Sequence, residues 1–182
     1  MALYEQPEVV LMLDIETLAA KTERAVVSQV ALIGYDLDKD EMIPIRHHQY
    51  YPLHPQIKDL KRVIEADTII WWMTQPDEAR RHFLECASDD VEELPALLKN
   101  LSMMFKDMTR NRPYEIYANS PSFDCKIVQS LLDDFGMQVP WDFRQERDLR
   151  SLCAMAGVDP KAVPHVPGFI AHNAYWDCRQ QI

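Results

Sequence analysis

Val9-Val10-Leu11-Met12-Leu13-Asp14-Ile15-Glu16 is an apolar run that leads into two acids. Five consecutive apolar residues are typical of a central strand buried on both faces, and Asp14 ends this apolar stretch. In an extended chain residues i and i+2 project to one side, so Asp14 and Glu16 can face one site while Ile15 packs into the core. Acids at a strand end are often only an exposed polar turn. The buried run favours a functional pair, because charges at a core boundary need compensation.

The segments that follow predict further strands and then helices, within one α/β domain over residues 1–182. Residues 28–36 and 42–50 have strand patterns and are separated by a polar turn, which predicts a three-stranded meander. Residues 114–118 predict a fourth, short strand. Helical spacing and end signals predict helices over residues 54–65, 78–86, 90–108, 122–135 and 148–156, and a last helix from about Ala171. The resulting order is β-β-β-α-β-α with a helical insertion.

Composition limits the class of protein. The 182 residues are 47% hydrophobic, and no apolar run approaches the ~20 residues that cross a bilayer, so no membrane association is expected. The four cysteines form no CxxC pair, which favours reduced thiols in a cytoplasmic protein. A formal charge of −10 disfavours a broad basic surface for long nucleic acid. This charge instead favours a short or single-stranded end that is held in a pocket.

A third acid follows the predicted fourth strand. Ser122-Phe123-Asp124 comes shortly after Ala118-Asn119, and Asp124 falls in the first turn of the next predicted helix. Asn119, Ser120 and Ser122 are candidate caps for that helix, and Phe123 is a candidate core residue. The alternative role for Asp124 is a favourable interaction with the helix macrodipole.

The C-terminal segment His172-Asn173-Ala174-Tyr175-Trp176-Asp177 adds a histidine and a fourth acid. Residues five apart on a helix are separated by about 140° net, so the two do not share a face. We therefore expect His172 on the preceding loop or at the helix N-terminus, and Asp177 one turn inside. A histidine with a pKa near 6.5 can accept a proton from water at neutral pH. A structural histidine that caps the helix is the alternative, and His165 in the same proline-rich loop is the rival base.

Four carboxylates and a histidine can hold two divalent cations, Mg²⁺ or Mn²⁺, and activate a water molecule. Three classes of function use such a set or its fold. They are an exonuclease, a metal-dependent phosphoesterase for small nucleotides, and a non-catalytic nucleic-acid-binding domain. The complete set of five residues disfavours the third class.

The fragments Asp14-Ile15-Glu16-Thr17, Ser122-Phe123-Asp124 and His172-Asn173-Ala174 with Asp177 resemble the three motifs of the DnaQ-like exonucleases, in their DEDDh branch. Residues 28–34 are similar to the second strand of that family. Residues 69–75 resemble a subgroup with mycobacterial-type 3′–5′ exoribonucleases and a T4-type phage exonuclease. The resemblance implies a ribonuclease-H-like fold, with an antiparallel meander plus parallel strands in one mixed sheet flanked by helices.

The resemblance also implies an activity and residue roles. The activity is stepwise release of 5′-mononucleotides from the 3′ end of single-stranded RNA or DNA. The four acids Asp14, Glu16, Asp124 and Asp177 would bind two metal ions, and His172 would be the general base. The residues that would meet the substrate are Thr17, Leu18, Asn119 and Phe123.

Two features leave alternatives open. Trp71-Trp72 could stack on a base or pack in the core or against another subunit, and adjacent helical residues point about 100° apart, so they cannot share one task. Only five residues follow Asp177, whereas family members continue this helix further, so a fragment of a longer protein is one alternative. An exposed tryptophan pair and a short last helix also favour a homodimer.

Overall fold

The computed structural model of the chain describes residues 6–86 and 92–182. Its elements in chain order are β1 (Val9–Thr17), β2 (Val27–Asp36), β3 (Glu41–Tyr50), α1 (Leu53–Lys58), α2 (Ala66–Met73), α3 (Asp77–Arg80), α4 (His82–Cys86), α5 (Leu94–Thr109), β4 (Tyr114–Ala118), α6 (Asp124–Asp133), η1 (Phe143–Gln145), β5 (Glu146–Asp148), α7 (Leu149–Ala156), η2 (Pro160–Ala162) and α8 (Ala174–Gln181). The predicted mixed sheet with flanking helices is confirmed.

The five strands form one sheet in the order β3-β2-β1-β4-β5. β1 is antiparallel to β2 and parallel to β4, and the predicted β1-β2-β3 meander is confirmed. β1 continues through both acids to Thr17, and Asp14 and Glu16 pair with β2 opposite Ala31 and Gln29, so the expected place of the acids at the C-terminal end of the strand is confirmed. β5 was not predicted from sequence, because its three residues are polar and too few to show a period.

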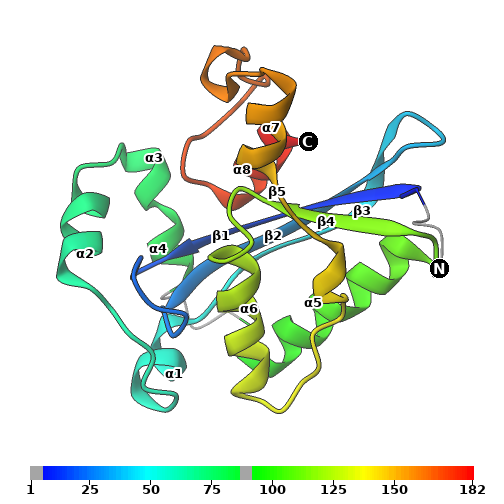
Figure 1. The fold of residues 1–182 in the computed structure, drawn as a ribbon. Coiled ribbons are helices and arrows are strands. Elements are labelled where there is room, and N and C mark those ends of the chain that lie inside the picture. Colours follow the sequence, from blue (N-terminus) through cyan, green and yellow to red (C-terminus); the bar gives the residue numbers. More distant parts are fainter. Residues whose placement is uncertain (1–5, 87–91) are drawn as a thin grey trace.

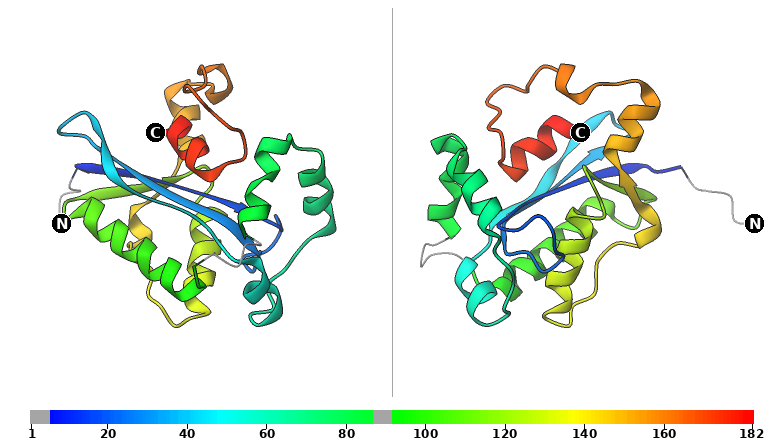
Figure 2. Two further views of the ribbon diagram at one scale, coloured as in Figure 1. Left: turned by 180° about the vertical axis from the view of Figure 1, so that it is seen from behind. Right: turned by 60° about the vertical axis from the view of Figure 1, so that its left-hand side comes forward.

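Alternate side chains of β1 pack into two different clusters. Leu11, Leu13 and Ile15 join the main core with α5 and α6, which lie on one side of the sheet (Figure 1). Met12 belongs to a smaller cluster with Ala174 and Cys178 of α8, on the other side. Figure 2 shows α8 lying across the sheet from α5 and α6. Since Asp14 and Glu16 continue the row of Met12, they face the side that α8 only partly covers.

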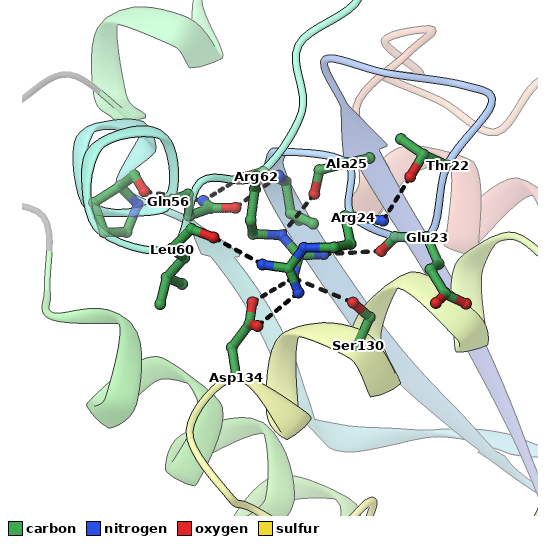
Figure 3. Close-up of polar contacts among 11 residues, drawn as sticks. Thr22, Glu23, Arg24, Ala25, Gln56, Leu60, Arg62, Ser130 and Asp134 are labelled. Atoms are coloured by element: carbon green, nitrogen blue, oxygen red, sulfur yellow. Dashed lines mark hydrogen bonds and ion pairs between the residues drawn. The ribbon is translucent and has the colours of Figure 1, made fainter.

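The helical insertion lies beyond the end of the sheet where β1 ends (Figure 1). The predicted helix over residues 54–65 is wrong, because α1 ends at Lys58. After α1 the chain is held by Arg62, whose buried guanidinium donates to the Ala25 carbonyl (2.9 Å) and to Asp134 (2.7 Å), the residue that follows α6. Figure 3 shows Arg62 and Arg24 converging on Asp134. The segment thereby pairs with the β1–β2 loop instead of continuing the helix.

The remaining helices differ from the predicted bounds mainly at their ends. The predicted helix over residues 78–86 is two short helices, α3 and α4. The predicted start at Asp90 lies outside the described residues, and α5 begins at Leu94. The last helix begins at Ala174 instead of Ala171, because Asn173 accepts a hydrogen bond from the Trp176 amide and caps it. Among the helices described, none combines the length and apolar character that a membrane span needs.

Candidate active site

Three carboxylates meet on the α8 side of β1. Asp14 and Glu16 come from β1, and Asp177 comes from the first turn of α8. Ligand oxygens of the three residues lie within 4.8 Å of one another. Ile15, between the two β1 acids, is 5% exposed and points into the main core as expected. The alternation along β1 therefore turns two acids toward one site.

Asp124 supplies a fourth carboxylate, from the start of α6. It is the first residue of α6, and the Ser120 amide donates to its carboxylate at 3.3 Å. The expected side-chain cap of this helix from Asn119, Ser120 or Ser122 is not made. The charge of Asp124 raises the pKa of both Asp14 and Glu16, so the four acids act on one another as a single cluster.

Burial raises the pKa of every carboxyl group in the cluster and is the largest cause for each. For Asp14, the charges of the three other acids raise the pKa further. The pKa of Asp124 rises to about 7 and that of Asp177 to about 6. A buried set of like charges is costly unless cations or protons neutralise it.

The chemistry of these donors fits divalent cations. Mg²⁺ and Mn²⁺ prefer carboxylate oxygens and keep bound waters. Gln181 of α8 lies beside the acids and hydrogen-bonds the Asp14 carboxyl group. Its Oε1 is buried, with no hydrogen-bond partner in the part of the chain that the structure describes. A cation with its water shell would satisfy both the repelling acids and this buried oxygen.

His172 precedes α8 on a loop, which agrees with one of the two expected positions. Its backbone is in the left-handed region, with φ of 59°. Its ring lies against Trp71, with centroids 4.7 Å apart, and burial lowers its pKa. The helix cap is Asn173, so the alternative of a capping histidine is wrong. The rival His165 instead stacks on Phe169 at 4.2 Å and does not line the acid cavity.

Two adjoining cavities surround the cluster. The first, of about 600 Å³, is lined by the residues Asp14, Ile15, Glu16, Ala20, Asn119, Ser120, Phe123, Asp124, Arg150, His172, Asp177 and Gln181. The second, of about 390 Å³, is lined by the residues Ile15, Glu16, Thr17, Ala20, Lys21, Glu65, Asp67, Thr68, Trp71, Trp72 and Phe123. Ile15, Glu16, Ala20 and Phe123 line both, so the two cavities are neighbours. One is rich in acids and the other contains the tryptophan pair.

The residues predicted to meet substrate are spread over these cavities. Asn119 lines the first cavity, Thr17 lines the second, and Phe123 lines both. Leu18 lines neither, because it is 4% exposed and packs in a cluster with Trp72. The tryptophans divide as their helical spacing predicts, with Trp72 buried and Trp71 42% exposed.

Sequence reasoning missed two supporting glutamines. Gln181 lies four residues after Asp177, and this helical spacing places both on one face, so the spacing alone could have identified it. Gln29 is fully buried on β2, opposite Glu16, and its Oε1 accepts the Ala174 amide at 3.1 Å. A polar residue inside the apolar β2 was the available signal, because a buried amide needs a specific partner.

The chain is similar to exonucleases of known structure. It matches cell-death related nuclease 4 (CRN-4) with a TM-score of 0.52 and 13% identity, covering 95% of this chain and 60% of that one. It matches exonuclease I without ligand with a TM-score of 0.61 and 15% identity, covering 97% of this chain and 40% of that one. For E. coli exonuclease I with a dA16 oligonucleotide the values are 0.62, 16%, 96% and 39%. At these identities the likeness concerns the fold, which is the ribonuclease-H-like fold of the DnaQ-like exonucleases.

Sequence comparison extends the likeness to a family. No curated protein matches the chain. The family profile described as the 3′–5′ exoribonuclease Rv2179c-like domain matches residues 9–182. That match spans the sheet, the four acids and His172. The chain therefore belongs to the family of 3′–5′ exoribonuclease Rv2179c-like domains.

Proposed function

We propose that the chain is a single exonuclease domain that releases 5′-mononucleotides, one at a time, from the 3′ end of single-stranded RNA or DNA. Two divalent cations, Mg²⁺ or Mn²⁺, would be its cofactors. The observation that carries the proposal is the convergence of four carboxylates and His172 on one cavity in a chain of this family. Exonuclease I, which has a similar fold, binds dT13 and dA16 oligonucleotides, and this supports a single-stranded substrate.

Asp14, Glu16, Asp124 and Asp177 would hold the cations. When bound, divalent cations polarise a water molecule and stabilise the charge that develops on the phosphate. The residues contribute the oxygens; Asp124 is buried, and Asp14, Glu16 and Asp177 are partly buried at the wall of the first cavity. Gln181, through its hydrogen bond to Asp14, would fix the orientation of one carboxylate.

His172 would accept the proton of the attacking water. Because burial lowers its pKa, the imidazole is neutral at pH 7 and can take up a proton. It lines the first cavity together with all four acids, so water attached to the cluster would lie in the same cavity as the imidazole. His165 stacks on Phe169 and does not line that cavity; its influence on the site is through its charge, which lowers the pKa of Asp177.

The second cavity would take the 3′-terminal nucleoside. Its volume of about 390 Å³ lies within the range of small-molecule pockets. Thr17, Phe123 and Trp71 supply a polar group and two aromatic rings, and the cavity joins the acid cluster at Glu16. Leu18 would support this cavity from within the core, through its packing with Trp72. Asn119 lines the first cavity and would contact the nucleic-acid strand there.

The test is a time course on single-stranded RNA and DNA oligomers that are labelled at the 5′ or the 3′ end. We expect 5′-labelled strands to shorten one nucleotide at a time, and 3′-labelled strands to release labelled mononucleotide at once. EDTA should stop both, and Mg²⁺ or Mn²⁺ should restore them. The oligomer that is degraded faster, RNA or DNA, is the preferred substrate.

Two outcomes would contradict the proposal. Internal cleavage products would indicate an endonuclease. Turnover of small nucleotide esters without degradation of any oligomer would indicate the phosphoesterase alternative. Asp177→Asn provides the control for contaminating nuclease, because removal of one ligand should abolish the degradation by this protein alone.

A further inference from the structure

The imidazole of His172 lacks the polar support that usually orients a catalytic histidine. Its backbone is held, because the amides of Asn173 and His172 hydrogen-bond the Asp177 carboxyl group. Within residues 6–86 and 92–182, however, its ring has aromatic contacts and no hydrogen bond or ion pair. The orientation of the ring therefore depends on packing.

Trp71 provides the nearest of these ring contacts. The centroids of the Trp71 and His172 rings are 4.7 Å apart and their planes meet at 79°, which is an edge-to-face arrangement. Trp72 is more distant from His172, at 6.1 Å. Trp71 belongs to α2 in the helical insertion, whereas His172 precedes α8. The contact thus joins two parts of the chain about one hundred residues apart.

Trp72 holds Trp71 in place. The indole Nε1 of Trp72 donates to the Thr17 carbonyl at 2.9 Å, at the end of β1. Trp72 is 2% exposed and packs edge-on against His82 and Phe83. Trp71 then packs on Trp72, with centroids 4.9 Å apart. β1 carries Asp14 and Glu16. The contacts from β1 through Trp72 and Trp71 therefore fix the position of His172 relative to the strand that bears two of the acids.

We propose, on the basis of the function proposed above, that Trp71 is a positioning residue that holds the His172 imidazole toward the acid cluster. The two tryptophans have different roles. Trp72 is a core residue that fixes the position of Trp71, and Trp71 in turn fixes the orientation of the His172 ring. Trp71 also lines the second cavity, so the same indole lies between the proposed nucleoside site and the base. A change at Trp71 should therefore affect both substrate binding and the chemical step, and only the second effect depends on His172.

The experiment is a double-mutant cycle with Trp71→Ala and His172→Ala, in which kcat and KM are measured by varying the concentration of a labelled oligomer. We expect Trp71→Ala to lower kcat about 3- to 10-fold, the range of a lost aromatic pair, and Trp71→Phe to restore most of the loss. In the His172→Ala background, Trp71→Ala should cause no further loss of kcat. A rise in KM from the altered cavity should persist in both backgrounds. Ile70→Ala, on the exposed side of the same helix, is the matched control and should leave kcat unchanged.

A second measurement does not require activity. In NMR spectra, an aromatic neighbour shifts the imidazole C–H resonances of a histidine through its ring current. Trp71→Ala should move the resonances of His172 and leave those of the five other histidines nearly unchanged. This readout also shows whether the variant is folded.

The proposal is overturned if Trp71→Ala lowers kcat by the same factor with and without His172, or if the His172 resonances do not move. Failure of the underlying function would look different. In that case wild-type protein would not degrade oligomers, or His172→Ala would be as active as wild type, whatever residue stands at position 71.

Discussion

Replacing Asp14 by asparagine should stabilise the metal-free protein at pH 8 while removing most of its activity. Asp14 is the acid whose pKa is raised by burial and by all three of its neighbours, Asp124, Glu16 and Asp177. Asparagine has almost the same shape and can still receive a hydrogen bond from Gln181. The change therefore removes a charge without opening a cavity, and its effect on the free energy of unfolding reports the electrostatic cost of the cluster.

The sign follows from the direction of the pKa shifts. A carboxyl group whose pKa is higher in the folded protein contributes stability that is fully present below its unfolded pKa of 3.8 and is lost as pH rises through the folded value. That value is about 6 for Asp177 and about 7 for Asp124. Between pH 5 and pH 8 the cluster thus becomes increasingly destabilising. The stability advantage of Asp14→Asn should grow over the same interval.

The magnitude can be bounded in two ways. The shift of Asp124 from 3.8 to about 7 corresponds to at most about 4 kcal/mol, at 1.36 kcal/mol per unit. Two charges 4.8 Å apart repel by about 3 kcal/mol at an effective dielectric of about 20. Since partial protonation relieves some of this repulsion, we expect Asp14→Asn to gain about 1–3 kcal/mol at pH 8. For a chain of this size that is about 2–12 °C in Tm.

The assay is unfolding by urea in EDTA at several pH values from 5 to 8, for wild type and variant side by side. Burial lowers the pKa of His47, His48 and His82 to about 4, so protonation of these histidines destabilises the fold as pH falls below about 6.5. That effect opposes the acids in each protein but cancels in the difference. Asp133→Asn, an exposed acid on α6, is the matched control and should change stability by less than about 0.5 kcal/mol. The reasoning would be refuted if the difference in unfolding free energy between Asp14→Asn and wild type did not change with pH, or if Asp14→Asn were less stable than wild type at pH 8.

Three further predictions concern single residues. His172→Ala should lower kcat by about 10²–10⁴-fold and retain its affinity for Mg²⁺, as measured by calorimetry. His165→Ala should keep a kcat near that of wild type. The reverse result would mean that the base is misassigned. Mg²⁺ at about 100 times its Kd should stabilise wild type by about 2.7 kcal/mol in urea unfolding and should stabilise Asp177→Ala far less; equal stabilisation would exclude Asp177 as a ligand. Arg62→Ala should cost about 2–4 kcal/mol in the same assay, because it removes the buried partner of Asp134, which keeps only the more exposed Arg24, and removes the hydrogen bonds to the Ala25 and Glu23 carbonyls. A loss below about 1 kcal/mol would contradict that role of Arg62.

The convergence of the four acids could be predicted because each acid belongs to a local pattern. The apolar run of β1 and the two-residue period of a strand predict the shared direction of Asp14 and Glu16. Asp124 follows a strand and opens a helix, and Asp177 lies one turn into another helix. These relations need only the geometry of strands and helices. They also predicted the meander of β1, β2 and β3, whose patterns are long enough to be recognised.

The supports of the site could not be predicted in the same way, because they depend on contacts between distant segments. Arg62 ends α1 early by donating hydrogen bonds to the β1–β2 loop and to α6, which no local pattern shows. β5 exists because Ile116 to Ala118 of β4 offer an edge to three polar residues. The aromatic contact between Trp71 and His172 likewise joins two segments whose distance along the chain gives no sign of it.

The placement of Asp177 shows how folding and the site depend on each other. α8 is eight residues long, and its N-terminus is held by Gln29 of β2, while Ala174 and Cys178 pack without exposure against β1 and β2. This packing brings the carboxylate of Asp177 to those of Asp14 and Glu16, whose charges repel it. In the metal-free protein the burial of these few residues must therefore outweigh the repulsion, and divalent cations would reverse the sign of that term. We therefore expect metal binding to be most strongly coupled to stability at α8, the short helix that packs on the sheet.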